Sequence, residues 1–427
     1  MLRYFDNEKT LKECKIYQML LENSKNKHLS FHTPGHKIAS WDITELSFSD
    51  NLSSPKGCIA EAEKDIAEIL GAAKSFILTD GSTSGVLSML YAAKGLGIKT
   101  LAVGVNSHKS VFNGCKLLGI TPLIYEQQEE NGDTMSALKN VFDGADALFF
   151  TSPDYYGKVV DLIKLREYCD KMGKLLLIDG AHGGHLHFDK TRHAGTYADL
   201  WVDGVHKSLP AFTQGAVVSA RTGTLARKLC EAVDVFRTTS PSYPIMASVE
   251  YAVKYPRNEE LEKRAWTLQK HARILKNDDW TKVCAVFGEH AFEVDKKLEK
   301  EGIYAEFCDG NIVMFYLSPA TSLETLETLE NRLKALFEKY PYKTKEKTQR
   351  TPAPLVLDED GKTEWVELER AKGRISAINC GLFPPCTPLI LAGEKIGAEK
   401  ILLLQKANNV FGVRENRILV LKENGVK

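Results

Sequence analysis

The sequence predicts an α/β fold, a mainly parallel sheet with helices on both faces, followed by a smaller C-terminal α+β domain. Short apolar runs alternate with helical patterns from residue 60 to about residue 240, as they do in chains that build parallel sheets. Beyond that point long amphipathic helical patterns dominate. A chain of 427 residues is also too long for one simple core.

In chain order, residues 10–24 carry apolar side chains at helical spacing, and residues 30–57 predict irregular structure because they are rich in Ser, Pro, Gly and Asp. Helices are expected at 60–70 and 84–94. The segment 75–81 predicts a strand followed by a turn. The other expected strands of the large sheet are 100–105, 121–125, 147–151, 174–179, 199–202 and 215–220.

The C-terminal part has its own set of expected elements. They are a strand at 311–317 and helices at 258–276, 285–301 and 322–340. The charged stretch 342–352 predicts a solvated linker or hairpin. We therefore expect three parts: an N-terminal helix and active-site segment (1–59), a large cofactor-binding domain (60–245) and a small C-terminal domain (246–427).

Composition narrows the functional classes. The formal net charge is zero, so no global field attracts nucleic acid or a membrane surface. No apolar run is long enough to span a bilayer, and the polar N-terminus does not resemble a signal peptide. Nine cysteines, an odd number without a CxxC pair, favour a reducing cytoplasm over a disulfide framework.

Two charged side chains stand at the ends of successive apolar runs. Asp179 ends the run "LLLID", and Lys207 follows the run 200–202, 28 residues further along (207 − 179). Ligands of parallel sheets bind at the carboxyl ends of strands, so both side chains can meet at one sheet edge. Taken alone, Asp179 also fits a capping or turn residue, and Lys207 a fortuitously half-buried lysine.

The segment "TDGSTSGV" (79–86) offers a phosphate site. Gly81 permits a tight turn, and Ser82 and Thr83 place hydroxyl and N–H groups at the start of an expected helix, where phosphate binds. These hydroxyls are equally typical of a structural helix cap. His108 also lies between a strand and a helix, where a structural role is the usual one.

Three imidazoles, those of His182, His185 and His187, raise the alternative of a metal site. Their spacing, H-x2-H-x-H, fits neither a helical pair nor a zinc finger. An extended segment would place His185 and His187 on one face and His182 on the other. We therefore predict no metal site.

The phosphate turn, the strand-end aspartate and the lysine together predict a site for pyridoxal 5'-phosphate. This cofactor needs a phosphate clamp, a carboxylate that keeps its pyridine nitrogen protonated and a lysine that holds it as a Schiff base. A flat side chain such as that of His108 can stack on its ring. Each signal is weak alone, and their order along the chain strengthens the prediction.

The motifs resemble those of the Orn/Lys/Arg decarboxylases, which have the aspartate-aminotransferase fold (fold type I). The resemblance is collinear from about residue 10 to beyond residue 394, and it fits the short forms that lack an N-terminal response-regulator-like domain. The matching stretches are "FHTPGHK" (31–37), "DITEL" (42–46), "TSPDYYG" (151–157), "IDGAHGGHLHF" (178–188), "HKSLPAFTQGA" (206–216), and "GRISA", "PPCTP" and "AGE" within 373–394.

The resemblance implies a role for each matching residue. Lys207 would be the Schiff-base lysine, Asp179 would pair with the pyridine nitrogen, and His108 would stack on the ring. In this family the site forms at a dimer interface, so Thr213 would serve the neighbouring subunit. A homodimer or higher homo-oligomer with shared active sites is the implied assembly.

Five further residues would surround the cofactor on the same resemblance. Ser82 and Thr83 would hold the phosphate, with His206 nearby. Ala181 would pack under the ring, and His182 would line the site near the phenolic oxygen.

The substrate side of the site is less defined. His32 and His36 lie in an N-terminal segment that helps to shape the site in the family. Arg374 would contact the substrate carboxylate or hold the C-terminal loop. An acidic group should bind the distal cation of a basic substrate, and Glu394 and Asp50 are candidates that also fit surface or capping positions.

Several positions depart from the family pattern, including the following four. Gly204 replaces the usual phosphate-binding hydroxyl residue three positions before the lysine, and Gly180 replaces the acidic residue after the aspartate. Cys386 replaces the glycine of a "PPG" turn, and Ile378 the acidic residue of "SAE". We expect altered phosphate binding and a remodelled substrate pocket.

The expected activity is that of a lyase: pyridoxal-phosphate-dependent decarboxylation of a basic amino acid to an amine and CO2, with His182 or Lys207 protonating Cα. The short architecture favours arginine, with lysine and ornithine as alternatives, and polyamine biosynthesis as the setting. The rivals are an aminotransferase or other lyase, which would give a different product such as a keto acid, and a catalytically silent binding or regulatory homologue.

Overall fold

The computed structural model describes residues 5–26, 29–37, 41–126, 134–342, 363–384, 386–407 and 409–422. Nearly all of the expected linker 342–352 lies outside the described residues. Among the described residues, no helix is both long enough and apolar enough to cross a membrane.

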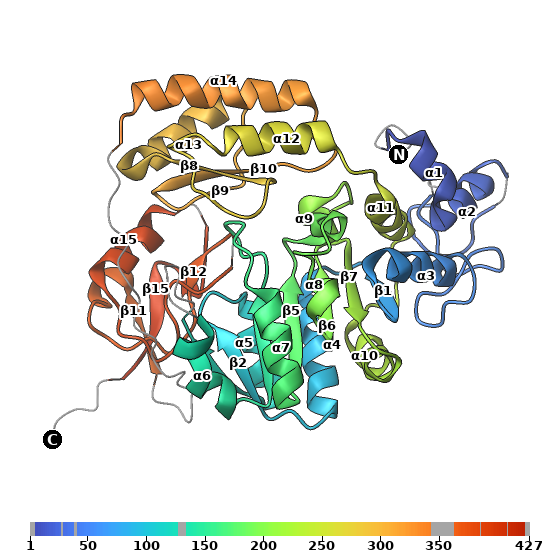
Figure 1. Ribbon diagram of the computed structural model, residues 1–427, viewed down its shortest axis with the longest axis horizontal. Coiled ribbons are helices and arrows are strands. Elements are labelled where there is room, and N and C mark those ends of the chain that lie inside the picture. Colours follow the sequence, from blue (N-terminus) through green and yellow to red (C-terminus); the bar gives the residue numbers. More distant parts are fainter. Residues whose placement is uncertain are drawn as a thin grey trace.

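A seven-stranded sheet is the centre of the molecule (Figure 1). Its order is β1-β7-β6-β5-β4-β2-β3, and β7 alone runs antiparallel to its neighbours. The strands are β1 (Lys74–Leu78), β2 (Thr100–Gly104), β3 (Thr121–Tyr125), β4 (Ala147–Thr151), β5 (Leu175–Gly180), β6 (Leu200–Asp203) and β7 (Ala216–Ala220). This confirms the predicted α/β class.

Successive side chains of the central strands enter different cores. Phe149 packs on one face of the sheet and Phe150 on the other, which is the period-two alternation of a strand buried on both faces. One face is covered by α3 (Cys58–Leu70), α6 (Thr134–Gly144), α7 (Leu162–Met172) and α11 (Tyr243–Lys254). The other is covered by α4 (Ser82–Gly95), α5 (Lys109–Leu118) and α10 (Gly223–Phe236).

The N-terminal helix predicted at 10–24 is two helices, α1 (Glu8–Glu13) and α2 (Lys15–Ser24), so the single helix was wrong. Cys14 between them is extended. The fully buried carboxylate of Glu250 accepts the N–H groups of Lys15 and Ile16 at 2.7 and 2.9 Å. A capping carboxylate from α11 therefore starts a new helix there.

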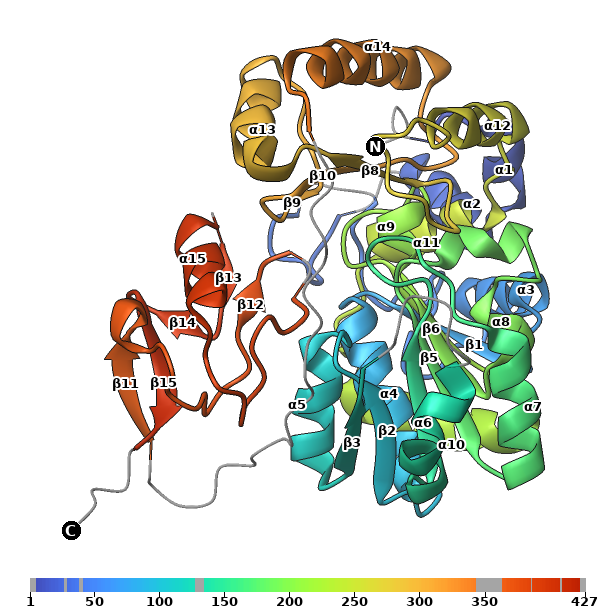
Figure 2. The ribbon, with the colours of Figure 1, turned by 60° about the vertical axis from the view of Figure 1, so that its left-hand side comes forward.

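A second, three-stranded sheet in the order β8-β10-β9 follows α11. The expected helix 285–301 was wrong at its start, because Lys282–Val286 is strand β8, which pairs antiparallel with β10. The expected helix 258–276 is also shorter than predicted. The elements are α12 (Glu259–Leu268), β8, α13 (Ala291–Lys300), β9 (Phe307–Cys308), β10 (Ile312–Tyr316) and α14 (Leu323–Lys339), and Figure 2 shows the helices above this sheet.

The C-terminal residues form a further small core of their own. Its elements are β11 (Thr363–Glu367), β12 (Gly381–Leu382), α15 (Ala398–Lys406), β13 (Val410–Phe411), β14 (Val413–Arg414) and β15 (Arg417–Leu421). Leu391 leaves this core and packs against the α4–α5 face of the large sheet. The C-terminal part therefore reaches the region in which the strands of the large sheet end.

Candidate active site

A cavity of about 210 Å³ lies where β4 and β5 end and α4 and α5 begin. This is the edge at which ligands of open α/β sheets bind. The seven residues predicted to bind the cofactor and the predicted catalytic residue His182 all line it; the seven are Ser82, Thr83, His108, Asp179, Ala181, His206 and Lys207.

The sheet explains why residues far apart in sequence meet there. Asp179 on β5 is paired with Thr151 at the end of β4 and Val202 on β6. The short helix α9 (Val205–Ser208) follows β6 directly and carries Lys207. The predicted meeting of Asp179 and Lys207 at one edge is confirmed by their shared cavity.

Asp179 and Lys207 influence each other through the cavity, although no ion pair directly joins them. Burial raises the pKa of Asp179, and the charge of Lys207 opposes that rise. Burial lowers the pKa of Lys207, and the carboxylates of Asp179 and Glu306 oppose that change. The backbone N–H of Ala181 donates to Asp179 Oδ1 at 3.0 Å. The lysine is thus easier to deprotonate than one in water.

His182 connects Lys207 to the second sheet. Its Nε2 lies 3.2 Å from Lys207 Nζ, and its Nδ1 lies 3.0 Å from the hydroxyl of Tyr316 on β10. Burial lowers its pKa well below the usual value, and Lys207 and Lys282 add to the effect. The imidazole is therefore neutral at pH 7.

The other two pocket histidines are also neutral. His108 caps α5, where its Nδ1 accepts the N–H of Ser110 at 3.2 Å. Burial lowers its pKa to about 3, helped by Lys207 and Lys109. Burial also lowers the pKa of His206, whose Nδ1 lies 2.9 Å from the carbonyl oxygen of Gly215.

The polar atoms of the cavity fit a phosphate-bearing ring. The hydroxyls of Ser82 and Thr151 are buried, and among the described residues neither has a hydrogen-bond partner. Ser82 starts the 14-residue helix α4, so its unpaired hydroxyl lies beside backbone N–H groups that bind anions. Asp179 and the imidazole of His108 line the same cavity, as the carboxylate and the flat stacking group should.

The structure explains two of the departures from the family pattern. A Cβ on Gly204 would lie 2.4 Å from the carbonyl oxygen of Ala181 and 2.9 Å from Ser82 Oγ. With this backbone a hydroxyl residue does not fit there. Cys386 has a left-handed φ of 62°, the conformation that a glycine adopts easily, so the turn is kept although the glycine is not.

The predicted substrate residues do not line the cavity. His36 Nε2 forms an exposed contact of 3.0 Å with Asp42, and His32 contacts Ser30. Arg374 donates to Glu364 Oε1 at 2.6 Å, and Glu394 pairs with Lys400. The roles of His32, His36, Arg374 and Glu394 in substrate binding stay predictions.

Asp50 is the other acidic candidate, and it acts as a cap. Its carboxylate accepts the N–H groups of Lys56, Gly57 and Ile59 at 2.8 to 2.9 Å around the start of α3. These bonds lower its pKa against the effect of burial, which alone would raise it.

The three clustered histidines have separate partners. His185 Nε2 lies 2.8 Å from Asp279 Oδ1, and His187 Nδ1 lies 2.7 Å from the carbonyl oxygen of Gly184. His182 faces Lys207 and Tyr316. Among the described residues, no group of three His, Cys, Asp or Glu side chains is arranged to hold a metal.

Sequence reasoning missed three residues near the cavity. Tyr155 lines it and packs edge-on against the His182 ring at 5.0 Å. Its hydroxyl donates to Glu306 Oε1 at 3.0 Å. Tyr155 belongs to the motif "TSPDYYG", which was a usable signal, whereas Tyr316 and Glu306 lie in no recognised motif.

The fold and the site together define an α/β protein with a ligand cavity at the carboxyl edge of its main sheet. Two family models match the chain: the Orn/Lys/Arg decarboxylase major domain at residues 37–284 and the Orn/Lys/Arg decarboxylase C-terminal domain at residues 331–411. The chain therefore belongs to the Orn/Lys/Arg decarboxylase family.

Full-length relatives are similar at low identity. "Uncharacterized protein YaaO" of Bacillus subtilis is 26% identical over 96% of this chain and 98% of its own length. The arginine decarboxylase of the same organism is 25% identical over 92% and 93%. The structure of the Escherichia coli constitutive lysine decarboxylase superposes with a TM-score of 0.73 at 18% identity, over 96% of this chain and 82% of that one, which confirms the fold.

Proposed function

We propose that this protein is a pyridoxal-phosphate-dependent decarboxylase that converts a basic amino acid, arginine in first place, to the amine and CO2. The observation that carries the proposal is the single cavity shared by Lys207, Asp179, His108 and Ser82. These side chains supply an amine, a buried carboxylate, a flat neutral ring and an unpaired hydroxyl at a helix start.

Each side chain has a place in binding the cofactor. Lys207 would bind it covalently, and Ser82 and Thr83 would hold its phosphate at the start of α4, with His206 beside them. His108 would stack on the ring, and Ala181 would pack under it. In this family the cofactor supplies an electron sink for the charge left at Cα when CO2 departs.

The acid–base work falls to Lys207 and His182. Their nitrogen atoms lie 3.2 Å apart, so a proton can pass between them. Burial lowers the pKa of both groups. A lysine of lowered pKa releases its proton more readily than one in water, and one of these two groups delivers a proton to Cα after CO2 leaves.

The position and charge of Glu306 favour a basic amino acid as the substrate. Its carboxylate is exposed, accepts the hydroxyl proton of the cavity residue Tyr155, and acts electrostatically on Lys207. Among the described residues, no lysine or arginine forms an ion pair with it. A carboxylate that contacts a cavity residue and lacks a cationic partner among the described residues suits the distal cation of arginine, lysine or ornithine.

The setting of the enzyme is part of the proposal. We assign it to the cytoplasm and to polyamine biosynthesis, as a homodimer or higher homo-oligomer with shared active sites in which Thr213, a cavity residue, serves the neighbour. The division into residues 1–59, 60–245 and 246–427 is proposed with it.

A substrate panel on cofactor-loaded protein tests the proposal. We expect CO2 and agmatine from arginine, and a visible absorption band of the bound cofactor that Lys207→Ala abolishes together with turnover. Glu306→Gln should raise the KM for arginine by about tenfold, the scale of losing one charge-assisted hydrogen bond, without removing the band.

Other products would contradict the proposal. Formation of a keto acid would indicate an aminotransferase. A cofactor band without turnover of any amino acid would indicate a silent homologue.

A further inference from the structure

The His182 side chain is held from two cores at once. Lys207 comes from α9 beside the large sheet, and Tyr316 comes from β10 of the second sheet. Their atoms lie 3.2 Å from Nε2 and 3.0 Å from Nδ1. Both ring nitrogens are therefore engaged, and the two bonds limit rotation of the ring.

The chemistry of the partners sets the direction of these hydrogen bonds. When Lys207 is protonated its ammonium group only donates, so Nε2 accepts, and the single proton of a neutral imidazole is then on Nδ1. Nδ1–H donates to the hydroxyl oxygen of Tyr316. The hydroxyl proton of Tyr316 points to the carbonyl oxygen of Tyr155, 3.4 Å away.

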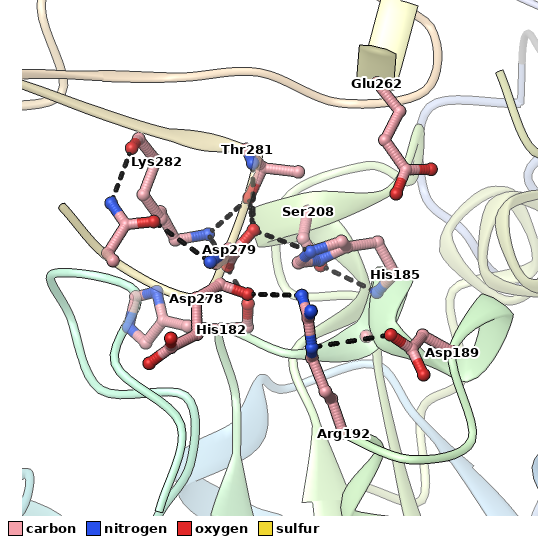
Figure 3. A network of polar contacts seen from close by, with 12 residues as sticks. His182, His185, Asp189, Arg192, Ser208, Glu262, Asp278, Asp279, Thr281 and Lys282 are labelled. Carbon is pink, nitrogen blue, oxygen red and sulfur yellow. Dashed lines mark hydrogen bonds and ion pairs between the residues drawn. The ribbon is translucent and has the colours of Figure 1, made fainter. Parts of the chain in front are cut away.

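Lys282 contacts both Tyr316 and His182 and belongs to a buried polar network, in which Figure 3 labels His182, Asp279 and Lys282. Lys282, which is fully buried, places Nζ 4.2 Å from the centroid of the Tyr316 ring and donates to the carbonyl oxygen of His182 at 3.4 Å. Asp279 lies 3.3 Å from the same Nζ and also binds His185 at 2.8 Å.

The charges around His182 keep it neutral. The groups that face it are Lys207, Lys282, His108 and His206, together with the hydroxyl of Tyr316 and the edge of Tyr155. Burial is the largest cause of its lowered pKa, and the charges of Lys207 and Lys282 act in the same direction.

Building on the proposed decarboxylation, we propose that Tyr316 is a positioning residue: it holds the His182 imidazole as the tautomer protonated on Nδ1, with Nε2 directed at Lys207. Lys282 supports this arrangement through the Tyr316 ring and the His182 backbone. A ring held in this way offers a lone pair at a fixed distance from the lysine nitrogen, where a proton is exchanged.

Tyr316→Phe tests the proposal, because it removes one hydroxyl and keeps the ring over Lys282. Nitrogen-15 NMR of labelled histidine in the full-length protein, with and without pyridoxal phosphate, reports the tautomer of His182 once its signal is assigned with His182→Asn. We expect Nδ1–H in the parent protein and a mixture of tautomers in the variant. We also expect kcat for arginine to fall by up to about 10²-fold, with KM nearly unchanged.

Tyr156→Phe is the matched control. It removes a neighbouring tyrosine hydroxyl that binds Asp309 at 3.1 Å and does not line the cavity. This variant should keep both the tautomer and kcat.

Two results would overturn the inference. One is a proton on Nε2 in the parent protein, or a tautomer that Tyr316→Phe leaves unchanged. The other is an altered tautomer with unchanged kcat in a protein that decarboxylates arginine. If the protein turns over no amino acid, the proposed function fails, while the NMR result still decides whether Tyr316 sets the tautomer.

Discussion

Lys207 and Lys282 are both lysines inside the protein whose charges act on an aspartate, Asp179 and Asp279 respectively. Lys207 faces a cavity of about 210 Å³, and no ion pair ties it directly to its aspartate. Lys282 is completely enclosed, with Asp279 at 3.3 Å and the Thr281 hydroxyl at 2.9 Å.

The difference shows how a reactive lysine can be told from a supporting one. Burying either charged amine costs free energy unless an opposite charge or hydrogen bonds offset that cost. At Lys282 the protein supplies this compensation through Asp279, the Thr281 hydroxyl and the carbonyl oxygen of His182. At Lys207 it leaves unpaired hydroxyls, on Ser82 and Thr151, in the same region of the cavity. The lysine that faces a cavity has room for a ligand beside it, whereas the fully enclosed lysine holds its neighbours in place.

Removing the two amines in turn is the sharpest test of this comparison. Lys282→Met should lower the free energy of unfolding by about 3–5 kcal/mol, because Asp279 is left buried without its cation. Lys207→Met should change the free energy of unfolding of the cofactor-free protein by less than about 1 kcal/mol, because the cavity can admit water. Urea unfolding of each variant measures both values.

The exposed Lys228, paired with Glu231 at 2.8 Å, provides the control. Lys228→Met should change stability by at most about 1 kcal/mol. Equal decreases in the free energy of unfolding for Lys207→Met and Lys282→Met would contradict the distinction between the two sites.

The sequence was enough to predict the Lys207 site but not the Lys282 network. Asp179, Lys207 and Ser82 each stand at a strand end or helix start of one parallel sheet, so local patterns and topology bring them together. Lys282, Tyr316 and Glu306 contact the cavity residues His182 and Tyr155 from the region of the second sheet, whose placement depends on packing between distant elements.

The same dependence on packing between distant elements explains why some helices and strands were predicted wrongly. The expected helix 285–301 included the last two residues of β8, a strand whose side chains do not alternate because four of its five residues are buried. Strand β8 is defined by its pairing with β10, about 30 residues further along. The break at Cys14 likewise depends on Glu250, a carboxylate from a remote helix.

A smaller effect is expected where the cavity wall is tightest. Gly204→Ser restores the usual hydroxyl of the family, but its Cβ would meet the Ala181 carbonyl oxygen at 2.4 Å. We expect a loss of about 1–3 kcal/mol in stability, as for overpacked cores, and weaker binding of pyridoxal phosphate in a spectroscopic titration. Gly223→Ser, at a site with open space around it, should show neither effect. Tighter cofactor binding by Gly204→Ser would refute the steric account.

The smallest expected effect is a difference in the pH range over which each of the two sites changes the stability of the protein. Burial lowers the pKa of His108 to about 3 from 6.5, so the unfolded chain binds its proton first and stability falls as the pH drops below 6.5. Asp279 has a lowered pKa because His185 and Lys282 outweigh the effect of burial, and its contribution to stability is lost only below the ordinary pKa range of aspartate.

Between about pH 6 and pH 4.5, His108→Asn, which keeps a helix cap, should reduce the slope of stability against pH by about 1.4 kcal/mol per unit. Urea unfolding of the cofactor-free protein across this range measures the slope, and an unchanged slope would show that the cavity does not keep His108 neutral.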